Sequence, residues 1–244
     1  MPKLSSASRS SAGAYQQRRF EEGRRAWRKR VLPTVGWLLF PGIAVCVGYE
    51  IVRPSTLHFM AGFCAGGLAC VYLWARDEVP EHVQRHADGA DGERRTEKAL
   101  EPLVKEGWHV AHDIDTGRGN RDHVVVGPGG VFLLDSKRLG GVVTIEGDTV
   151  RVDRVDDPRD SYDLPKLAAT ARGEAWKLHN EIAQQSGVRT WVTAVVVIWS
   201  RFDARLVEGD RIVFLHGEEL AGWLRKAPRR HSDATVARIA EHVG

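Results

Sequence analysis

The sequence contains little cysteine. Its three cysteines are Cys46, Cys64 and Cys70, so the chain after residue 70 has no thiol for a disulfide or a cysteine-ligated zinc site. The sequence also lacks a P-loop, a dinucleotide-binding glycine fingerprint and any internal repeat. These absences exclude a disulfide-stapled scaffold, a zinc-finger module, a P-loop NTPase and a repeat protein.

Two stretches near the N-terminus lack charged side chains. No Asp, Glu, Lys or Arg occurs over the 18 positions of residues 32–49 or the 21 positions of residues 55–75. A helix of this length crosses a hydrocarbon core about 30 Å thick. Because only residues 50–54 separate the stretches, the pattern predicts a two-helix transmembrane hairpin at residues 32–75. The lipid bilayer would then be a partner of this segment.

The segment before these stretches is basic. Residues 1–31 contain nine Lys or Arg and two Glu, together with much Ser, Ala and Gln, and are expected to form a disordered arm. Positive charge beside a first span holds that end in the cytoplasm, and the second span would return residues 76–244 to the same side. We therefore expect a multi-pass membrane protein with both termini cytoplasmic. Anionic lipid headgroups would bind residues 1–31.

The charge balance reverses after this arm. The whole chain has 35 basic and 32 acidic residues, so removing nine and two leaves 26 basic and 30 acidic residues, a net charge of about −4. Bulk charge therefore gives no support to tight binding of nucleic acid by the rest of the chain.

The remainder has the pattern of a linker and one folded domain. Residues 76–91 are polar and charged, which indicates a linker, and residues 92–244 alternate between helical and strand periodicity. A long helix near residues 164–185 precedes an apolar run at residues 191–199, which is typical of a strand buried on both faces. This order predicts a three-layer α/β sandwich with one central mixed sheet. Three tryptophans are expected in its core: Trp176, Trp191 and Trp199.

Two apolar runs in this domain flank a turn. DHVVV at residues 122–126 and VFLLDSK at residues 131–137 are joined by Gly127-Pro128-Gly129-Gly130, a pattern that predicts a β-hairpin. If the turn is symmetric, Val126 faces Val131. Every later pair of the hairpin then follows from the two-residue period of a strand.

This register places two carboxylates side by side. Asp122 falls opposite Asp135, with Cβ atoms about 5 Å apart, where like charges repel unless a cation or a shared proton lies between them. Lys137 points to the same face as Asp135. By themselves Asp135 and Lys137 would indicate an ordinary ion pair. With Asp122 in register, the three residues indicate a metal-dependent centre that cleaves phosphodiesters.

The motif extends beyond the hairpin. Gly92-Glu93 opens a helix upstream, NRDHVVVGPGGVF occupies residues 120–132, and Asp135-Ser136-Lys137 follows. This set resembles the nuclease-related domain (NERD) family, in which the corresponding stretches are approximately GE, IDHVVVGPxGVF and ETK. The resemblance covers about residues 88–217. Arg121 stands where the family usually has Ile, and Asp135-Ser136 where Glu-Thr is commoner.

The resemblance implies a restriction-endonuclease-like fold and a catalytic site. Glu93, Asp122 and Asp135 would be the metal ligands, and Lys137 the catalytic lysine. The implied ion is Mg²⁺, or Mn²⁺, because hard divalent ions take oxygen ligands and polarise a phosphate. For Glu93 there is an alternative interpretation, since an acid in the first turn of a helix is favoured by the helix dipole alone. Glu97, one turn later, is the competing residue.

The expected function is cleavage of DNA or RNA by a membrane-anchored, metal-dependent nuclease. Arg118 and Arg121 lie near the acids and would contact substrate phosphates, although a solvated loop accounts for them equally well. One alternative is a non-catalytic module that binds nucleic acid or protein and retains the nuclease fold. Another is that the membrane hairpin is the main functional element and the domain senses a partner.

Overall fold

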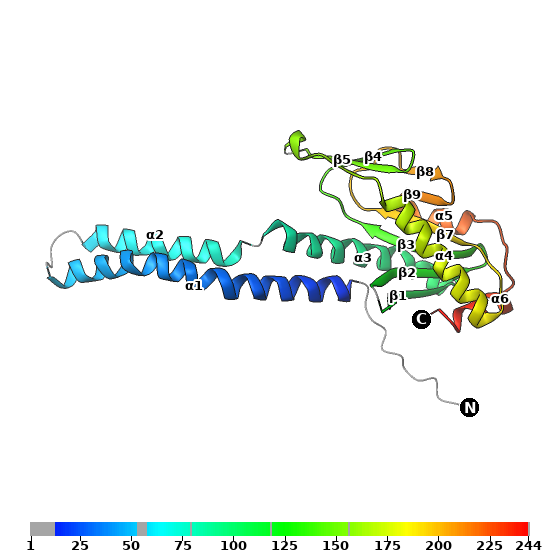
Figure 1. Ribbon diagram of the computed structural model, residues 1–244, viewed down its shortest axis with the longest axis horizontal. Coiled ribbons are helices and arrows are strands. Elements are labelled where there is room, and N and C mark those ends of the chain that lie inside the picture. Colours follow the sequence, from blue (N-terminus) through cyan, green and yellow to red (C-terminus); the bar gives the residue numbers. More distant parts are fainter. Residues whose placement is uncertain (1–12, 53–57, 79, 118, 156, 244) are drawn as a thin grey trace, which may run out of the picture. The chain divides into compact units, whose positions relative to one another are not determined.

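The computed structural model describes residues 13–52, 58–78, 80–117, 119–155 and 157–243 (Figure 1). Contacts divide the chain into two units. One contains residues 88–244 and the segment before residue 17, and the other contains residues 17–87. The helices are α1 (Ala14–Val52), α2 (His58–Asp77), α3 (Glu81–Lys105), α4 (Leu167–Ser186), α5 (Leu220–Lys226) and α6 (Asp233–Ala240).

The strands of the first unit form two sheets. The strands are β1 (His109–Asp115), β2 (Asn120–Gly127), β3 (Gly130–Lys137), β4 (Val142–Glu146), β5 (Thr149–Asp153), β6 (Tyr162–Leu164), β7 (Val192–Ile198), β8 (Leu206–Gly209) and β9 (Ile212–His216). The larger sheet has six strands in the order β1-β2-β3-β7-β9-β8, and β4-β5-β6 form the smaller one. The pairs β3–β7 and β7–β9 are parallel and the other pairs of the larger sheet antiparallel, so the predicted central mixed sheet is confirmed.

Helices cover both faces of this sheet. On one face Val124, Val126 and Val196 pack with the buried stripe of α4 and with α6, and Figure 1 shows α4 crossing that face. On the other face Val125 and Val195 pack with the second half of α3 and with α5. Alternate residues of one strand thus enter different cores, because successive side chains point to opposite faces. The valine-rich strand β7 is buried on both faces, as its sequence predicted.

The hairpin turn depends on one glycine. Gly127 ends β2, and a Cβ built there would lie 2.0 Å from the ring of Trp108. The indole therefore lies against bare backbone and closes the core beneath α3. A side chain at residue 127 would displace this ring.

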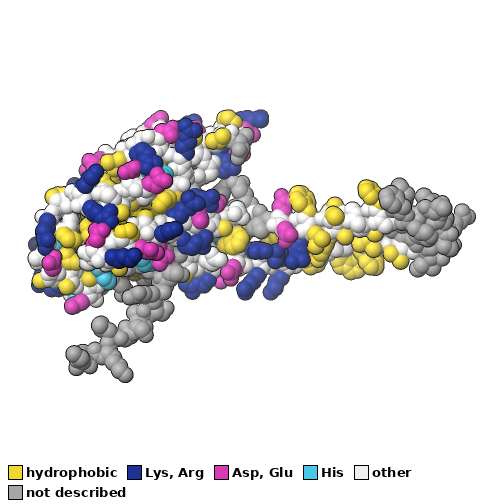
Figure 2. All heavy atoms as spheres, turned by 180° about the vertical axis from the view of Figure 1, so that it is seen from behind, with side chains coloured by type: hydrophobic (Ala, Val, Ile, Leu, Met, Phe, Trp, Pro, Cys, Tyr) yellow, Lys and Arg dark blue, Asp and Glu magenta, His cyan; other side chains and the backbone are white. Residues whose placement is uncertain are grey.

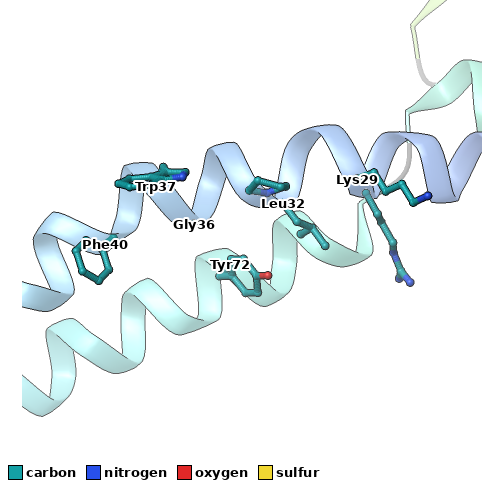
Figure 3. Close-up of a pocket in the computed structure, with 8 residues that line it drawn as sticks. Lys29, Leu32, Gly36, Trp37, Phe40 and Tyr72 are labelled. Carbon is teal, nitrogen blue, oxygen red and sulfur yellow. The ribbon is translucent and has the colours of Figure 1, made fainter.

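The second unit contains most of α1, all of α2 and the start of α3. Helices α1 and α2 lie side by side, with Arg28 paired to Asp77 at 3.5 Å. They border a hollow of about 760 Å³, and Figure 3 shows Trp37, Phe40 and Tyr72 along it. Apolar side chains are exposed along these helices, and Lys and Arg side chains gather next to them (Figure 2). The residues that line the hollow include no carboxylate, so it is not the predicted metal site.

The predicted transmembrane hairpin is wrong. Within the described ranges, no helix combines the length and the apolar character that a bilayer crossing requires. Residues 32–49 are not a separate span but part of the 39-residue helix α1, which begins in the basic segment and contains two prolines. Helix α2 ends on Arg76-Asp77, whereas a span needs about 20 consecutive apolar residues. The multi-pass location, and the lipid partners inferred for residues 1–31 and 32–75, depended on this hairpin.

Two boundary predictions also change. Residues 14–31, expected to be disordered, are helical in α1, and residues 1–12 lie outside the described ranges. The expected linker at residues 76–91 contains the end of α2 and the first part of α3. Val83 in that part of α3 packs against Gly23 of α1, where the absence of a side chain leaves room for it. This polar segment is helical because of tertiary contact, which its sequence pattern does not reveal.

Candidate functional site

The β2–β3 hairpin has the register that its turn predicted. Val126 pairs with Val131, and the ladder continues to His123 and Leu134. Beyond that pair, the backbone N–H of Ser136 donates to Oδ2 of Asp122 at 2.9 Å. The carboxylate of Asp122 thus replaces a backbone acceptor at the point where the ladder ends.

Asp135 and Lys137 complete the end of strand β3. They alternate with Ser136, so their side chains share a face, and Nζ of Lys137 donates to Oδ1 of Asp135. Both side chains are half-buried. The structure therefore brings Asp122, Asp135 and Lys137 together, and the ion pair expected of an isolated Asp-x-Lys is present as well.

Helix α3 brings the third carboxylate to this place. Glu93 is 2% exposed, and its Oε2 is buried without a hydrogen-bond partner in the part of the chain that the structure describes. One turn later, the hydroxyl of Thr96 lies 2.7 Å from the Ser136 hydroxyl and accepts a hydrogen bond from the Trp199 indole at 2.8 Å. This three-way contact ties α3 to β3 and to Trp199, the residue that follows β7. It fixes the part of α3 that carries Glu93.

Burial is the largest single influence on the pKa values of Asp122, Glu93 and Lys137. It raises the pKa of Asp122 well above its usual range, and the neighbouring Asp135 carboxylate adds to the increase. The pKa of Glu93 is raised to about 7, first by burial and then by Asp113. Burial would lower the pKa of Lys137, but Asp135 and Asp122 together raise it above its ordinary value. The lysine therefore stays charged, and the carboxylates exceed the cations around them.

Asp113 belongs to this cluster, although no sequence pattern singled it out. It lies in β1 at a left-handed φ of 52° and accepts a hydrogen bond from Asn120 Nδ2 at 2.6 Å. Its other oxygen accepts from the backbone N–H of Tyr15, at the start of α1, at 3.0 Å. The neighbouring Gly13 N–H bonds to Glu93. The pairing of strand β1 with β2 was needed to bring Asp113 to the acids.

Residues 88–199 match the family model described as the nuclease-related domain, NERD. This segment is a nuclease-related domain. It is a little under half of the chain and includes all four predicted catalytic residues, from Glu93 to Lys137. No curated protein and no solved structure matches the chain. The sequence-based resemblance is confirmed for this segment, and strands β8 and β9 lie beyond it.

Of the two arginines predicted to bind phosphate, the structure describes one. Arg118 lies outside the described residues. Arg121 of the nuclease-related domain is buried and makes a two-pronged ion pair with Glu181 of α4, at 2.6 and 2.8 Å. This pair occupies its guanidinium and joins β2 to α4. Its contact with phosphate stays a prediction.

The histidines beside the acids form a separate pair. His123 is fully buried, and its Nδ1 lies 2.7 Å from Nδ1 of His112. Burial lowers the pKa of His123 to about 3, so the ring is neutral at physiological pH. His112 is a half-buried residue of β1.

The acidic side chains of the nuclease-related domain are close but not arranged as a ready metal cluster. Within the described ranges, no three His, Cys, Asp or Glu side chains converge closely enough to hold an ion. Lys137 engages one oxygen of Asp135, and the Ser136 N–H engages one oxygen of Asp122. The arrangement therefore combines an excess of buried carboxylates with contacts that compete for their oxygens.

Proposed function

We propose that the nuclease-related domain hydrolyses phosphodiester bonds of DNA or RNA with the help of a divalent ion, Mg²⁺ or Mn²⁺. The supporting observation is the convergence of Glu93, Asp122, Asp135 and Lys137 from α3, β2 and β3. Three carboxylates around one ammonium form a site with excess negative charge, which a cation would balance. Perturbed pKa values of this kind cluster at functional sites.

The donor chemistry fits a hard divalent ion. Asp122, Asp135 and Glu93 supply carboxylate oxygens, the ligands that Mg²⁺ prefers. The buried, unpartnered Oε2 of Glu93 is an acceptor for which the described residues offer no donor. A bound ion would neutralise charge on the phosphate and lower the pKa of an attached water. Because the side chains are not a ready cluster, we expect ion and substrate to bind together.

The residues of the chain have distinct roles in this proposal. Lys137 remains charged beside the acids, so its ammonium can donate to a phosphate oxygen or orient the attacking water as negative charge develops. Asp122 is held in one orientation by the Ser136 N–H. Glu93, with a pKa of about 7, can hold a proton at neutral pH and release it when positive charge arrives.

Cleavage assays with the full chain test this function. Single- and double-stranded DNA and RNA would be incubated with Mg²⁺, Mn²⁺ or EDTA. Asp135→Asn and Lys137→Met should abolish metal-dependent cleavage. The controls are Asp163→Asn and Lys177→Met, two exposed residues elsewhere on the domain. Absence of cleavage on every substrate, together with no metal binding by calorimetry, would exclude the proposed activity.

The second candidate is a non-catalytic module that binds nucleic acid or protein. The competing contacts of Lys137 with Asp135, and the net charge of about −4 after residue 31, favour it. The same assays separate the two functions. A binding module would retain its ligand in EDTA and would leave every substrate intact in Mg²⁺.

A further inference from the structure

Aromatic side chains form a cluster on the surface far from the acids. Trp176 and His179 of α4 stack with ring centroids 5.1 Å apart and planes inclined by 24°. Trp191, just before β7, lies 6.1 Å from Trp176 and 5.7 Å from His179. Arg211, in the β8–β9 turn, lies over the Trp191 ring at 5.3 Å. We name these four residues the aromatic platform.

The platform is open to solvent. Trp176 is 52% exposed and Trp191 41% exposed, although both were expected in the core. Trp176 follows Ala175 of the buried stripe and points away from the sheet, since one residue turns a helix by about 100°. A hollow of about 370 Å³ lies over these rings. Exposed, clustered tryptophans are typical of binding surfaces.

The charge around the platform differs from that of the rest of the domain. A second hollow of about 400 Å³ shares Trp191 and Arg211 with the first. Four basic residues (Arg172, Arg211, Lys226 and Arg230) and two acidic ones (Glu208 and Asp210) line the two hollows. Arg172 is paired with Asp148, but the surplus is still positive, whereas the chain after residue 31 is negative overall.

We propose that the aromatic platform binds single-stranded nucleic acid. Bases would stack on Trp176 and Trp191, and Arg211 and its basic neighbours would hold phosphates. Aromatic faces combined with positive charge are the features by which proteins bind unpaired strands without reading their sequence. This inference rests on the proposed function, because the platform would retain the strand that the acidic site cleaves. A duplex, whose bases are already stacked, offers no free base faces to these rings.

The platform and the acids lie at opposite ends of the same strands. Val131 pairs with Val192 at the start of the parallel β3–β7 ladder, and Lys137 pairs with Ile198 at its end. Six residues of strand correspond to about 20 Å. A single strand at the stacked spacing of 3.4 Å per nucleotide covers this length with about six nucleotides. The platform would therefore act on longer strands and leave very short substrates unaffected.

Binding is measured with the full chain in EDTA, so that no cleavage occurs. The probe is a labelled oligothymidylate of about twelve nucleotides, which has little structure of its own. Loss of one stacking contact in Trp176→Ala should weaken binding about 5- to 140-fold. Trp176→Phe should retain most of the affinity, and Arg211→Gln should weaken binding with a smaller dependence on salt. Trp74→Ala, at a tryptophan that is 68% exposed on α2, is the matched control.

The outcomes separate this inference from the nuclease proposal. Binding that depends on Trp176 without cleavage in Mg²⁺ would support the platform and count against the nuclease. Cleavage with equal affinity in Trp176→Ala, Arg211→Gln and the unchanged chain would overturn the platform alone. Equal binding of single strand and duplex would also overturn it. Absence of binding to any oligonucleotide would overturn it too, and would leave a peptide as the ligand of this surface. Thermal unfolding of each variant verifies that it is folded.

Discussion

Replacing Glu93 by Gln should change how the stability of the metal-free protein depends on pH. The folded state raises the pKa of Glu93 from 4.5 to about 7 because the carboxyl is buried and faces Asp113. Below pH 4.5 the residue is protonated in both the folded and the unfolded chain. Between pH 4.5 and about 7 the unfolded chain ionises Glu93 in water while the folded protein keeps it protonated, and above about 7 the folded protein must bury the charge. Its stability therefore falls over this window.

The magnitude follows from the size of the shift. A difference of about 2.5 pH units corresponds to about 3 kcal/mol of unfolding free energy, which is lost between pH 4.5 and about 8. The neutral amide of Glu93→Gln does not titrate. The variant should therefore gain about 3 kcal/mol relative to the unchanged protein over this range. Urea unfolding in EDTA at several pH values measures the difference.

The contribution of Glu93 is separated from that of His123 by comparing two proteins, and a control variant tests the substitution itself. His123 acts in the opposite direction, because its pKa is lowered to about 3 and it destabilises the fold as pH falls below about 6.5. It is present in both proteins, so its contribution cancels in their difference. Glu101→Gln, the same substitution at an exposed position of the same helix, is the matched control variant. A difference between Glu93→Gln and the unchanged protein that stays constant within about 1 kcal/mol would refute the reasoning.

Three further predictions concern the scaffold and the ion. Gly127→Ala should destabilise the domain by about 1–3 kcal/mol, because its Cβ would meet an indole ring at 2.0 Å. Gly173→Ala should stabilise the domain by about 0.5–1 kcal/mol, because a Cβ at this position of α4 would meet open space. Urea unfolding measures both changes. Thr96→Val removes the acceptor of the partly buried Trp199 indole N–H and should cost about 1–3 kcal/mol by the same measurement. Mg²⁺ at about 100 times its dissociation constant should stabilise the protein by about 2.7 kcal/mol at pH 8 in thermal unfolding. Asp122→Asn should remove this effect, and an equal response in both proteins would contradict the assignment of Asp122 as a ligand.

The local features of the site could be predicted because they depend on neighbouring residues. The glycine-rich turn and the two-residue period of β2 and β3 determine that Val126 faces Val131, and this register places Asp122 beside Asp135. The apolar stripe of α4 and the β-branched run of β7 likewise specify which of their faces are buried. Glu93 was identified through the family resemblance. The expectation that Gly92-Glu93 opens a helix is wrong, because Glu93 lies in the middle of α3 (Glu81–Lys105), where the first-turn preference for an acid does not apply.

The tertiary structure decided the features that depend on distant segments. The contact of Thr96 with Ser136 brings Glu93 to the acids, and strand pairing adds Asp113. The packing of α4 leaves Trp176 exposed, although its hydrophobicity favoured the core. A count of uncharged positions predicted a membrane hairpin, but such a count does not reveal where a helix begins or ends. No helix of the described residues is long and apolar enough to cross a membrane.

By itself, then, the sequence determined the hairpin, its register and the proximity of Asp122 to Asp135, because strand period and turn chemistry act between neighbouring residues. Only the tertiary structure decided how deeply these carboxylates are buried and which charges surround them. The reason is that burial and charge, which raise the pKa values of Glu93 and Asp122, come from α3 and β1 packed against the hairpin.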